Sequence, residues 1–229
     1  EILRCLVGSE MCIRDSYKSM KKLIPLLLVV LTFAACEKDP DTDKLDNKYL
    51  VYTNYDSKAD FKAFQTYYMP DSILVIGDKK EAEYWKDESA QEILQAYATN
   101  MNNRGFVRVD DREEANLGLQ VSYIKSTYYF NDYGRPEWWW NYPGYWDAPY
   151  WGNWGGWYYP YAVTYTYSTG SFITELLNLE ATQGEKEKLP VLWTSYMSGL
   201  LSGSTSVNTK LAVEGVNQAY AQSSYLTNK

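Results

Sequence analysis

The chain has 229 residues, a formal net charge of −7, three Cys and no His, and 17% of its residues are aromatic. Catalytic Ser-His-Asp and Cys-His groups need an imidazole, and many zinc sites use one as a ligand. The composition therefore excludes the commonest hydrolase mechanisms and every metal site that depends on His. The excess of acidic residues argues against binding to nucleic acid and against electrostatic attraction to anionic lipids.

Residues 1–19 resemble translated sequencing adaptor, and we expect them to be a non-native extension. Met20 begins a different pattern, in which two Lys precede 13 mostly apolar residues that end in Ala34 and Ala35. This pattern is typical of a secretory signal peptide, and it is shorter than the roughly 20 residues that span a bilayer. We expect residues 20–35 to be removed from the mature protein.

Cys36 directly follows the two small residues, as the lipidated Cys does in the lipobox of bacterial lipoproteins. Phe33 stands where that motif usually has Leu, a departure that lipoproteins of the Bacteroidetes type tolerate. A diacylglyceryl group with a further acyl chain would anchor the protein stably, because one chain alone gives only marginal binding. We expect an outer-membrane lipoprotein on the periplasmic or cell-surface face; the alternative is an ordinary secreted protein with a stray Cys.

Removal of residues 1–35 leaves 194 residues with 17 Lys and Arg against 26 Asp and Glu, a net charge of −9. Cys36 is then the one remaining Cys, so no disulfide is expected. Residues 36–48 are almost entirely polar and predict a flexible tether. Acidic residues alternate within it, but the Gly and Glu that a calcium loop requires are missing. We expect neither a metal nor a cofactor.

A single folded domain is predicted for residues 49–229. Its first segments, 50–55 and 64–69, are rich in β-branched and aromatic residues and predict strands. The apolar run 73–76 is either a third strand or a buried loop. The chain is long enough for this domain to bury a core without disulfides or metals.

The clearest helix is predicted over residues 89–103, where apolar residues recur at helical spacing. Asp87 or Ser89 can cap its start, and Gly105 suits its end. Residues 106–109 and 117–123 follow as strands, and the charged turn between them predicts that they pair as a hairpin.

An aromatic insert occupies residues 128–167, which contain seven of the nine Trp and eleven of the 23 Tyr. Five Gly and four Pro leave neither helical nor strand periodicity, and a loop of this length is usually functional or disordered. Aromatic side chains in the insert form the predicted contact surface: Trp138, Trp139, Trp140, Tyr145, Trp146, Trp151, Trp154 and Trp157.

Four roles for the aromatic insert stay open. Its rings could stack on sugars, lie at a membrane interface, or form a hot spot for a protein partner. The simplest alternative is a low-complexity loop that packs on the domain's own sheet.

Glycoside hydrolysis would need two carboxyl groups at a fixed separation, for which Glu137 and Asp147 are the candidates. Such a Gly- and Pro-rich loop gives poor support for that geometry, so we expect no catalytic activity.

Two further strands are predicted over residues 170–179 and 189–196, and the charged turn between them predicts a hairpin. A helix is predicted to follow over residues 208–225. Gly215 within that helix costs about 1 kcal/mol relative to Ala. Because hairpins dominate the order of elements, the sequence predicts an α+β fold. Its sheet would be largely antiparallel, with about five strands and with both helices on one face.

Several blocks of the chain are similar to bacterial lipoproteins of the domain of unknown function 4136 family. They are DFKAFQTY (60–67), NRGF (103–106), EANLGL (114–119), GSFITELL (170–177) and VLW (191–193). Asn116 stands where many members have Asp. The resemblance spans most of residues 49–225 and implies a small α+β envelope lipoprotein without an established activity or transferable site.

We therefore expect an outer-membrane-anchored, non-catalytic binding or assembly module whose aromatic insert contacts an envelope glycan or a protein. The alternative is a glycan-binding or glycosidase-like protein that uses the same insert.

Overall fold

The computed structural model describes residues 49–77, 83–125, 156–163, 168–181, 188–200 and 204–229. All of these ranges belong to the compact unit that runs from Asn47 to Lys229. The extension, signal peptide, lipidation site and tether predicted for residues 1–48 lie outside them, as does most of the aromatic insert. Within the described ranges, no helix combines the length and apolar character needed to cross a bilayer.

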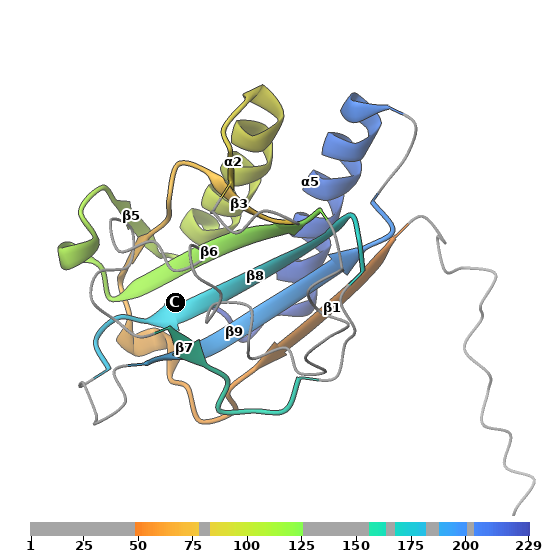
Figure 1. The fold of residues 1–229 in the computed structure, drawn as a ribbon. Helices are drawn as coiled ribbons and strands as arrows, with labels where there is room; N and C mark the ends of the chain where they lie inside the picture. The colour runs from red at the N-terminus through yellow and green to blue at the C-terminus, as the bar shows by residue number, and fades with distance from the viewer. Residues whose placement is uncertain (1–48, 78–82, 126–155, 164–167, 182–187, 201–203) are drawn as a thin grey trace, which may run out of the picture. The chain divides into compact units, whose positions relative to one another are not determined.

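The described part of the domain consists of one sheet, two α-helices and two short 3-10 helices (Figure 1). The strands are β1 (Leu50–Tyr55), β2 (Thr66–Tyr68), β3 (Ile73–Ile76), β4 (Glu83–Trp85), β5 (Val107–Val109), β6 (Leu117–Ile124), β7 (Trp157–Tyr158), β8 (Ser171–Asn178) and β9 (Leu189–Ser198). The helices are η2 (Phe61–Ala63), α2 (Glu88–Asn103), η3 (Arg112–Glu114) and α5 (Thr205–Gln222).

The sheet is mixed, with its main strand order β1-β9-β8-β6-β2-β5. Its centre is antiparallel, because β1 pairs with β9, β9 with β8, and β8 with β6. Beyond β6 the pairing becomes parallel, since β2 and β3 both run in the direction of β6. The predicted α+β class is confirmed. The sheet differs from the prediction in two details, because it is mixed rather than largely antiparallel and has nine described strands rather than about five.

β2 and β3 lie one after the other along the same edge of β6. β2 pairs with the start of β6, and β3 pairs with its end. Pro70 lies in the four residues between them, where its missing N–H removes a donor from the ladder. Together, β2 and β3 therefore occupy a single strand position beside β6. Residues 73–76, for which a strand or a buried loop was expected, form a strand.

The predicted hairpin of residues 106–109 with 117–123 is wrong, because β2 lies between β5 and β6. Asn116 explains this order: its Oδ1 accepts hydrogen bonds from the backbone N–H groups of Gln65, at 2.9 Å, and Thr66, at 3.0 Å. Its Nδ2 donates to Glu180 Oε1 at 2.6 Å. These contacts hold the start of β2 beside β6, so β5 pairs with the outer edge of β2.

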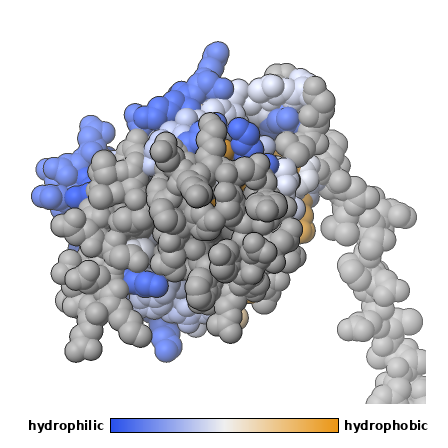
Figure 2. Space-filling view, in the orientation of Figure 1, coloured by the Kyte–Doolittle hydropathy of each residue, from blue (hydrophilic) through white to orange (hydrophobic). Residues whose placement is uncertain are grey.

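Helix α2 buries the predicted apolar stripe and ends as predicted. Asp87 is the N-cap, and its side chain accepts a hydrogen bond from the N–H of Ala90 at 3.1 Å. Gly105 follows the helix with a φ of 95°, a backbone conformation that favours glycine. The visible surface of α2 is hydrophilic in Figure 2, so the helix has one buried and one exposed face. The buried residues are Ala90, Ile93, Leu94, Tyr97, Ala98 and Met101.

Helix α5 packs on the same face of the sheet as α2 (Figure 1). Gly215 is buried where α5 approaches β9 and β1: a Cβ atom there would lie 2.9 Å from Met197 Sδ. Gly215 thus weakens the helical propensity of α5 but favours the close approach of helix and sheet. Tyr97 of α2, Tyr220 of α5 and Trp193 of β9 form adjoining ring contacts at the centre of this core.

The opposite face of the sheet has a smaller core that includes the end of the aromatic insert. Trp157 of β7 is fully buried there, and β7 pairs in parallel with the start of β9. Within residues 156–163, Gly156 and Trp157 are thus buried against the domain's own sheet, whereas the others are half-buried or exposed. The buried residues of this second core are Leu74, Ile76, Trp157, Leu177, Leu189 and Val191.

Candidate functional site

An open cavity of about 470 Å³ lies where the first turns of α2 and α5 meet the sheet. Its size is within the range of about 300–1,000 Å³ that ligand pockets usually have. Strands β3, β4, β6 and β8 contribute to its walls. The lining residues are Val75, Glu83, Tyr84, Trp85, Lys86, Asp87, Ile93, Tyr123, Lys125, Gly170, Phe172, Leu200, Thr205, Asn208 and Thr209.

Three aromatic rings form one wall of the cavity. The ring centroids of Trp85 and Tyr123 are 5.7 Å apart in an edge-on arrangement, and those of Tyr123 and Phe172 are 5.1 Å apart. Phe172 is buried, whereas Trp85 and Tyr123 are half-buried and keep part of their surface open. Burial raises the pKa of Tyr123 above its ordinary value. The wall thus offers apolar ring surface with a neutral hydroxyl group.

The first turn of α5 supplies polar side chains to the cavity. Thr205 and Asn208 are exposed and half-buried, respectively, and Thr209 is buried. The Thr209 hydroxyl donates a hydrogen bond to the backbone oxygen of Thr205 at 3.0 Å. This side of the cavity therefore carries uncharged hydroxyl and amide groups within reach of the aromatic wall.

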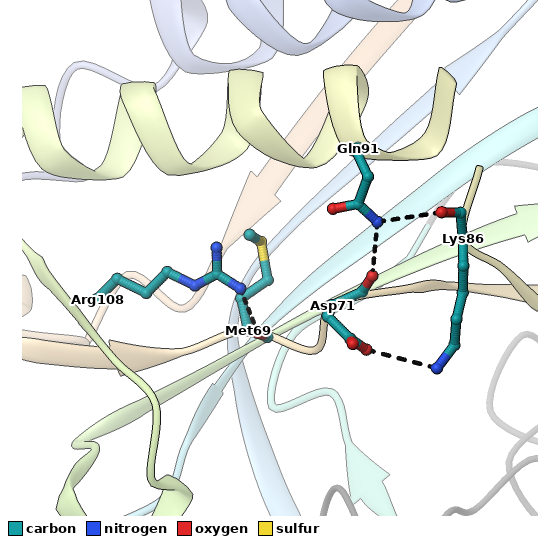
Figure 3. Close-up of polar contacts among 5 residues, drawn as sticks. All are labelled: Met69, Asp71, Lys86, Gln91 and Arg108. Atoms are coloured by element: carbon teal, nitrogen blue, oxygen red, sulfur yellow. Dashed lines mark hydrogen bonds and ion pairs between the residues drawn. The ribbon is translucent and has the colours of Figure 1, made fainter. Parts of the chain in front are cut away.

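Each Lys of the cavity lies beside a carboxylate, and the further lining carboxylate, Asp87, caps α2. Lys125 Nζ lies 3.6 Å from Glu83 Oε1, and Lys86 Nζ lies 3.7 Å from Asp71 Oδ1. Gln91 of α2 holds the second pair in place, because its side-chain amide donates to the backbone oxygens of Asp71, at 2.8 Å, and Lys86, at 3.5 Å (Figure 3). Both ion pairs are largely exposed, so each contributes about 1 kcal/mol or less to stability.

A further hydrogen bond joins β5 to the segment between β2 and β3, close to the Asp71–Lys86 pair. Arg108 of β5 donates a hydrogen bond to the backbone oxygen of Met69 at 3.0 Å, as Figure 3 shows. Among the described residues, no group of three or more Cys, Asp or Glu is placed to hold a metal ion. The arrangement at the cavity can bind an uncharged or amphipathic molecule without displacing a resident charge.

A buried carboxyl group lies apart from the cavity, on the opposite face of the sheet. Glu175 of β8 has no exposed surface, and its Oε1 accepts a hydrogen bond from the Tyr159 hydroxyl at 2.7 Å. Burial raises the pKa of Glu175 to about 8, while hydrogen bonding by Tyr159 and Trp157 acts in the opposite direction. At pH 7 this carboxyl is therefore mainly protonated.

Of the residues singled out in the sequence, Trp157 lies in the described part of the chain. It has no exposed surface and packs inward, so it is not part of an exposed contact surface. Cys36, Glu137 and Asp147 lie outside the described residues. So do Trp138, Trp139, Trp140, Tyr145, Trp146, Trp151 and Trp154.

The residues that line the cavity were not predicted from the amino-acid sequence. Trp85 and Trp193 are the two Trp outside the aromatic insert, and their neighbours differ. Trp193 lies between Leu192 and Thr194 and is fully buried, whereas Trp85 follows Tyr84, precedes the charged residues Lys86 and Asp87, and is half-buried. A Trp followed directly by charged residues was thus the available signal for a partly exposed aromatic wall.

The chain matches the family described as "Domain of unknown function (DUF4136)" over residues 51–223. A crystal structure of a family member from Bacteroides thetaiotaomicron is similar, with 62% sequence identity and a TM-score of 0.74. That match covers 80% of this chain and 100% of the other. The family resemblance noted in the sequence blocks is therefore confirmed.

A more distant structure is a PelC dodecamer from Paraburkholderia phytofirmans, with 14% identity and a TM-score of 0.33. The match covers 76% of this chain and 97% of that chain, but the backbones differ too much for their sites to be compared. No curated protein matches the chain.

Proposed function

We propose, starting from the fact that this chain belongs to the DUF4136 family, that its domain binds a ligand in the cavity and catalyses no reaction there. The state of the carboxyl groups supports this proposal. Glu83 is paired with Lys125, and Asp87 caps helix α2. A general acid or base needs a carboxyl that is free to exchange a proton with the reacting group, and these two are already engaged.

The ligand-binding domain is anchored to the outer membrane through Cys36 in this proposal. The basic start, the short apolar run and the two Ala before Cys36 support it. The 13 residues from Cys36 to position 48 would link the lipid anchor to the domain.

Fractionation of cells that express the full chain tests the anchor. Wild type is expected in the membrane fraction and to incorporate labelled palmitate, and Cys36→Ser is expected to be soluble and unlabelled. Asp43→Ser is the matched control, because it changes the same segment and leaves the lipidation site intact. Membrane retention of Cys36→Ser, or a soluble wild type, would contradict the anchor.

The aromatic insert is the second candidate contact surface, and the combined replacement of five Trp by Ala tests it. The five are Trp138, Trp139, Trp140, Trp151 and Trp154. Co-sedimentation with envelope polysaccharides or lipid vesicles should fall if these rings make the contact. Equal sedimentation of wild type and variant would remove this surface from the proposal. For the glycosidase-like alternative with Glu137 and Asp147, release of reducing ends from envelope glycans would be the supporting result.

A further inference from the structure

We propose that the cavity between α2, α5 and the sheet binds an uncharged saccharide, with a sugar ring against Trp85 and Tyr123 and its hydroxyl groups toward the first turn of α5. This inference rests on the proposed ligand-binding function and specifies the chemical class of the ligand. Three properties of the cavity carry it: its aromatic wall, its hydroxyl and amide groups, and its compensated charges.

The aromatic wall matches the apolar side of a sugar. A pyranose ring presents C–H groups on its faces, and these groups carry partial positive charge that the negative face of an aromatic ring attracts. Trp85 and Tyr123 are both half-buried and both line the cavity, so they can be covered further by a ligand. The ring centroid of Phe172 lies 5.1 Å from that of Tyr123 and 6.2 Å from that of Trp85, so the buried Phe172 supports both rings.

The polar residues match the rim of a sugar. Asn208 and Thr205 lie on the same cavity as Trp85, on a different element of the fold. A sugar presents hydroxyl groups around its edge, and each can both donate and accept a hydrogen bond. Amide and hydroxyl side chains have the same dual capacity. A simple acyl chain would leave these polar groups facing an apolar surface, which is unfavourable.

The charges favour a ligand without net charge. Each Lys of the cavity has a carboxylate partner, with Lys125 beside Glu83 and Lys86 beside Asp71. An anionic ligand would have to compete with these carboxylates for the ammonium groups and would meet their negative charge. An uncharged ligand can bind without breaking either pair, so we expect discrimination against acidic sugars.

Ligand-observed NMR with the full chain in lipid nanodiscs tests the inference. The probes are neutral oligosaccharides built from glucose, mannose, galactose, xylose or N-acetylglucosamine, together with trigalacturonate as an acidic sugar and laurate as an amphiphile. We expect at least one neutral oligosaccharide to bind, and trigalacturonate to bind at least about tenfold more weakly.

Three variants connect that binding to the cavity. Trp85→Ala is expected to weaken it about tenfold or more, and Asn208→Ala about threefold to tenfold. Val107→Ala is the control, because Val107 is an apolar residue with 59% exposure that lies outside both the cavity and the aromatic insert. Circular dichroism establishes that each variant is folded, and Asn208→Ala provides the test should Trp85→Ala not fold.

Each remaining outcome overturns the inference in a distinguishable way. Binding of laurate without any neutral oligosaccharide would exclude a saccharide and leave a ligand-binding cavity standing. Preference for trigalacturonate would exclude the uncharged class. Saccharide binding that neither Trp85→Ala nor Asn208→Ala weakens would place the site elsewhere in the chain. Binding of no probe would overturn both the saccharide and the cavity as a ligand site, whereas the anchor is tested separately by fractionation.

Discussion

The two faces of strand β8 are buried by different means. Toward the helices, Phe172 and Leu176 pack in an apolar core, and the Thr174 hydroxyl lies 2.6 Å from that of Tyr97. Toward the other side, Glu175 is fully buried beside the end of the aromatic insert. The helix-covered face of β8 thus buries apolar and hydroxyl side chains, whereas the other face also buries a carboxyl group.

The difference shows which interactions are needed to bury each face of the sheet. Two amphipathic helices cover the first face with long apolar stripes, and this cover depends mainly on area and close packing. The second face also buries the polar side chains of Gln120 and Thr194, so it needs hydrogen-bond partners as well as apolar surface. Tyr159 supplies one such partner to Glu175. The following four substitutions test how far the two faces are independent.

The largest effect is expected from Trp193→Ala on the helix-covered face. Trp193 is fully buried, packs on Tyr220 and donates a hydrogen bond to the Ser223 hydroxyl at 2.9 Å. Loss of the ring leaves a cavity and removes one hydrogen bond of the Ser223 hydroxyl, which keeps its bond to the Ala219 carbonyl. We therefore expect the free energy of unfolding to fall by about 3–5 kcal/mol. Urea unfolding monitored by circular dichroism measures this change; a loss below 1 kcal/mol would contradict it.

Trp157→Ala makes the matched change on the opposite face and should cost less, about 2–3 kcal/mol. Trp157 is equally buried, but β7 has two residues and pairs only with the start of β9 among the described strands. Such a segment can open locally without global unfolding, which limits the loss. Hydrogen exchange should show faster exchange near Leu189 than in α2. A loss equal to that of Trp193→Ala would mean that the two faces unfold as one unit.

Glu175→Gln should change the pH dependence of stability. Burial raises the pKa of Glu175 from its ordinary value of 4.5 to about 8 in the folded protein. Between these values the folded chain holds a proton that the unfolded chain has lost, so the contribution of Glu175 to stability falls as pH rises and is lowest above pH 8. The amide keeps an acceptor for Tyr159 without the buried charge.

At pH 9 we expect Glu175→Gln to be more stable than wild type by about 1–3 kcal/mol, with a smaller difference at pH 5. Urea unfolding at both values measures it. Glu92→Gln, a change of an exposed Glu on α2, is the control. A wild-type advantage that grows with pH would show that the carboxylate is stabilised by its surroundings.

The smallest effect is expected from Gly215→Ala, which tests close packing on the helix-covered face. The added methyl group would meet Met197 Sδ at 2.9 Å in a buried position. Overpacking costs about 1–3 kcal/mol, and the better helical propensity of Ala returns about 1 kcal/mol. We expect a net loss of about 1 kcal/mol in thermal unfolding. Gly215→Ala combined with Met197→Ala should recover part of it, and a stabilised single variant would contradict the close approach.

Local patterns in the chain predicted the elements of the helix-covered face well. The stripe from Ala90 to Met101, the cap at Asp87 and the stop at Gly105 all act within a few residues, so neighbouring positions carry the information. The hairpin of β8 and β9 was predicted for the same reason, because a short charged turn joins two apolar runs. Gly215 was predicted as a cost to α5, and its packing against Met197 depends on a residue in another strand.

The neighbours of β2 could not be predicted from local patterns. Residues 106–109 and 117–123 resemble a hairpin, but the side chain of Asn116 binds backbone groups about 50 positions away and brings β2 between them. The cavity has the same origin, because Trp85, Tyr123 and Asn208 come from three distant segments. No spacing in the chain relates these residues to one another.

The amino-acid sequence was sufficient for the α+β class, the two helices with their faces, the family and the absence of imidazole chemistry. These properties follow from composition and from periodicity over a few turns, which are encoded locally. The tertiary structure alone determines the strand order, the burial of Glu175 and Trp157, and the aromatic cavity. Each depends on contacts between segments that are distant in the sequence, and these contacts form when both faces of the sheet are packed.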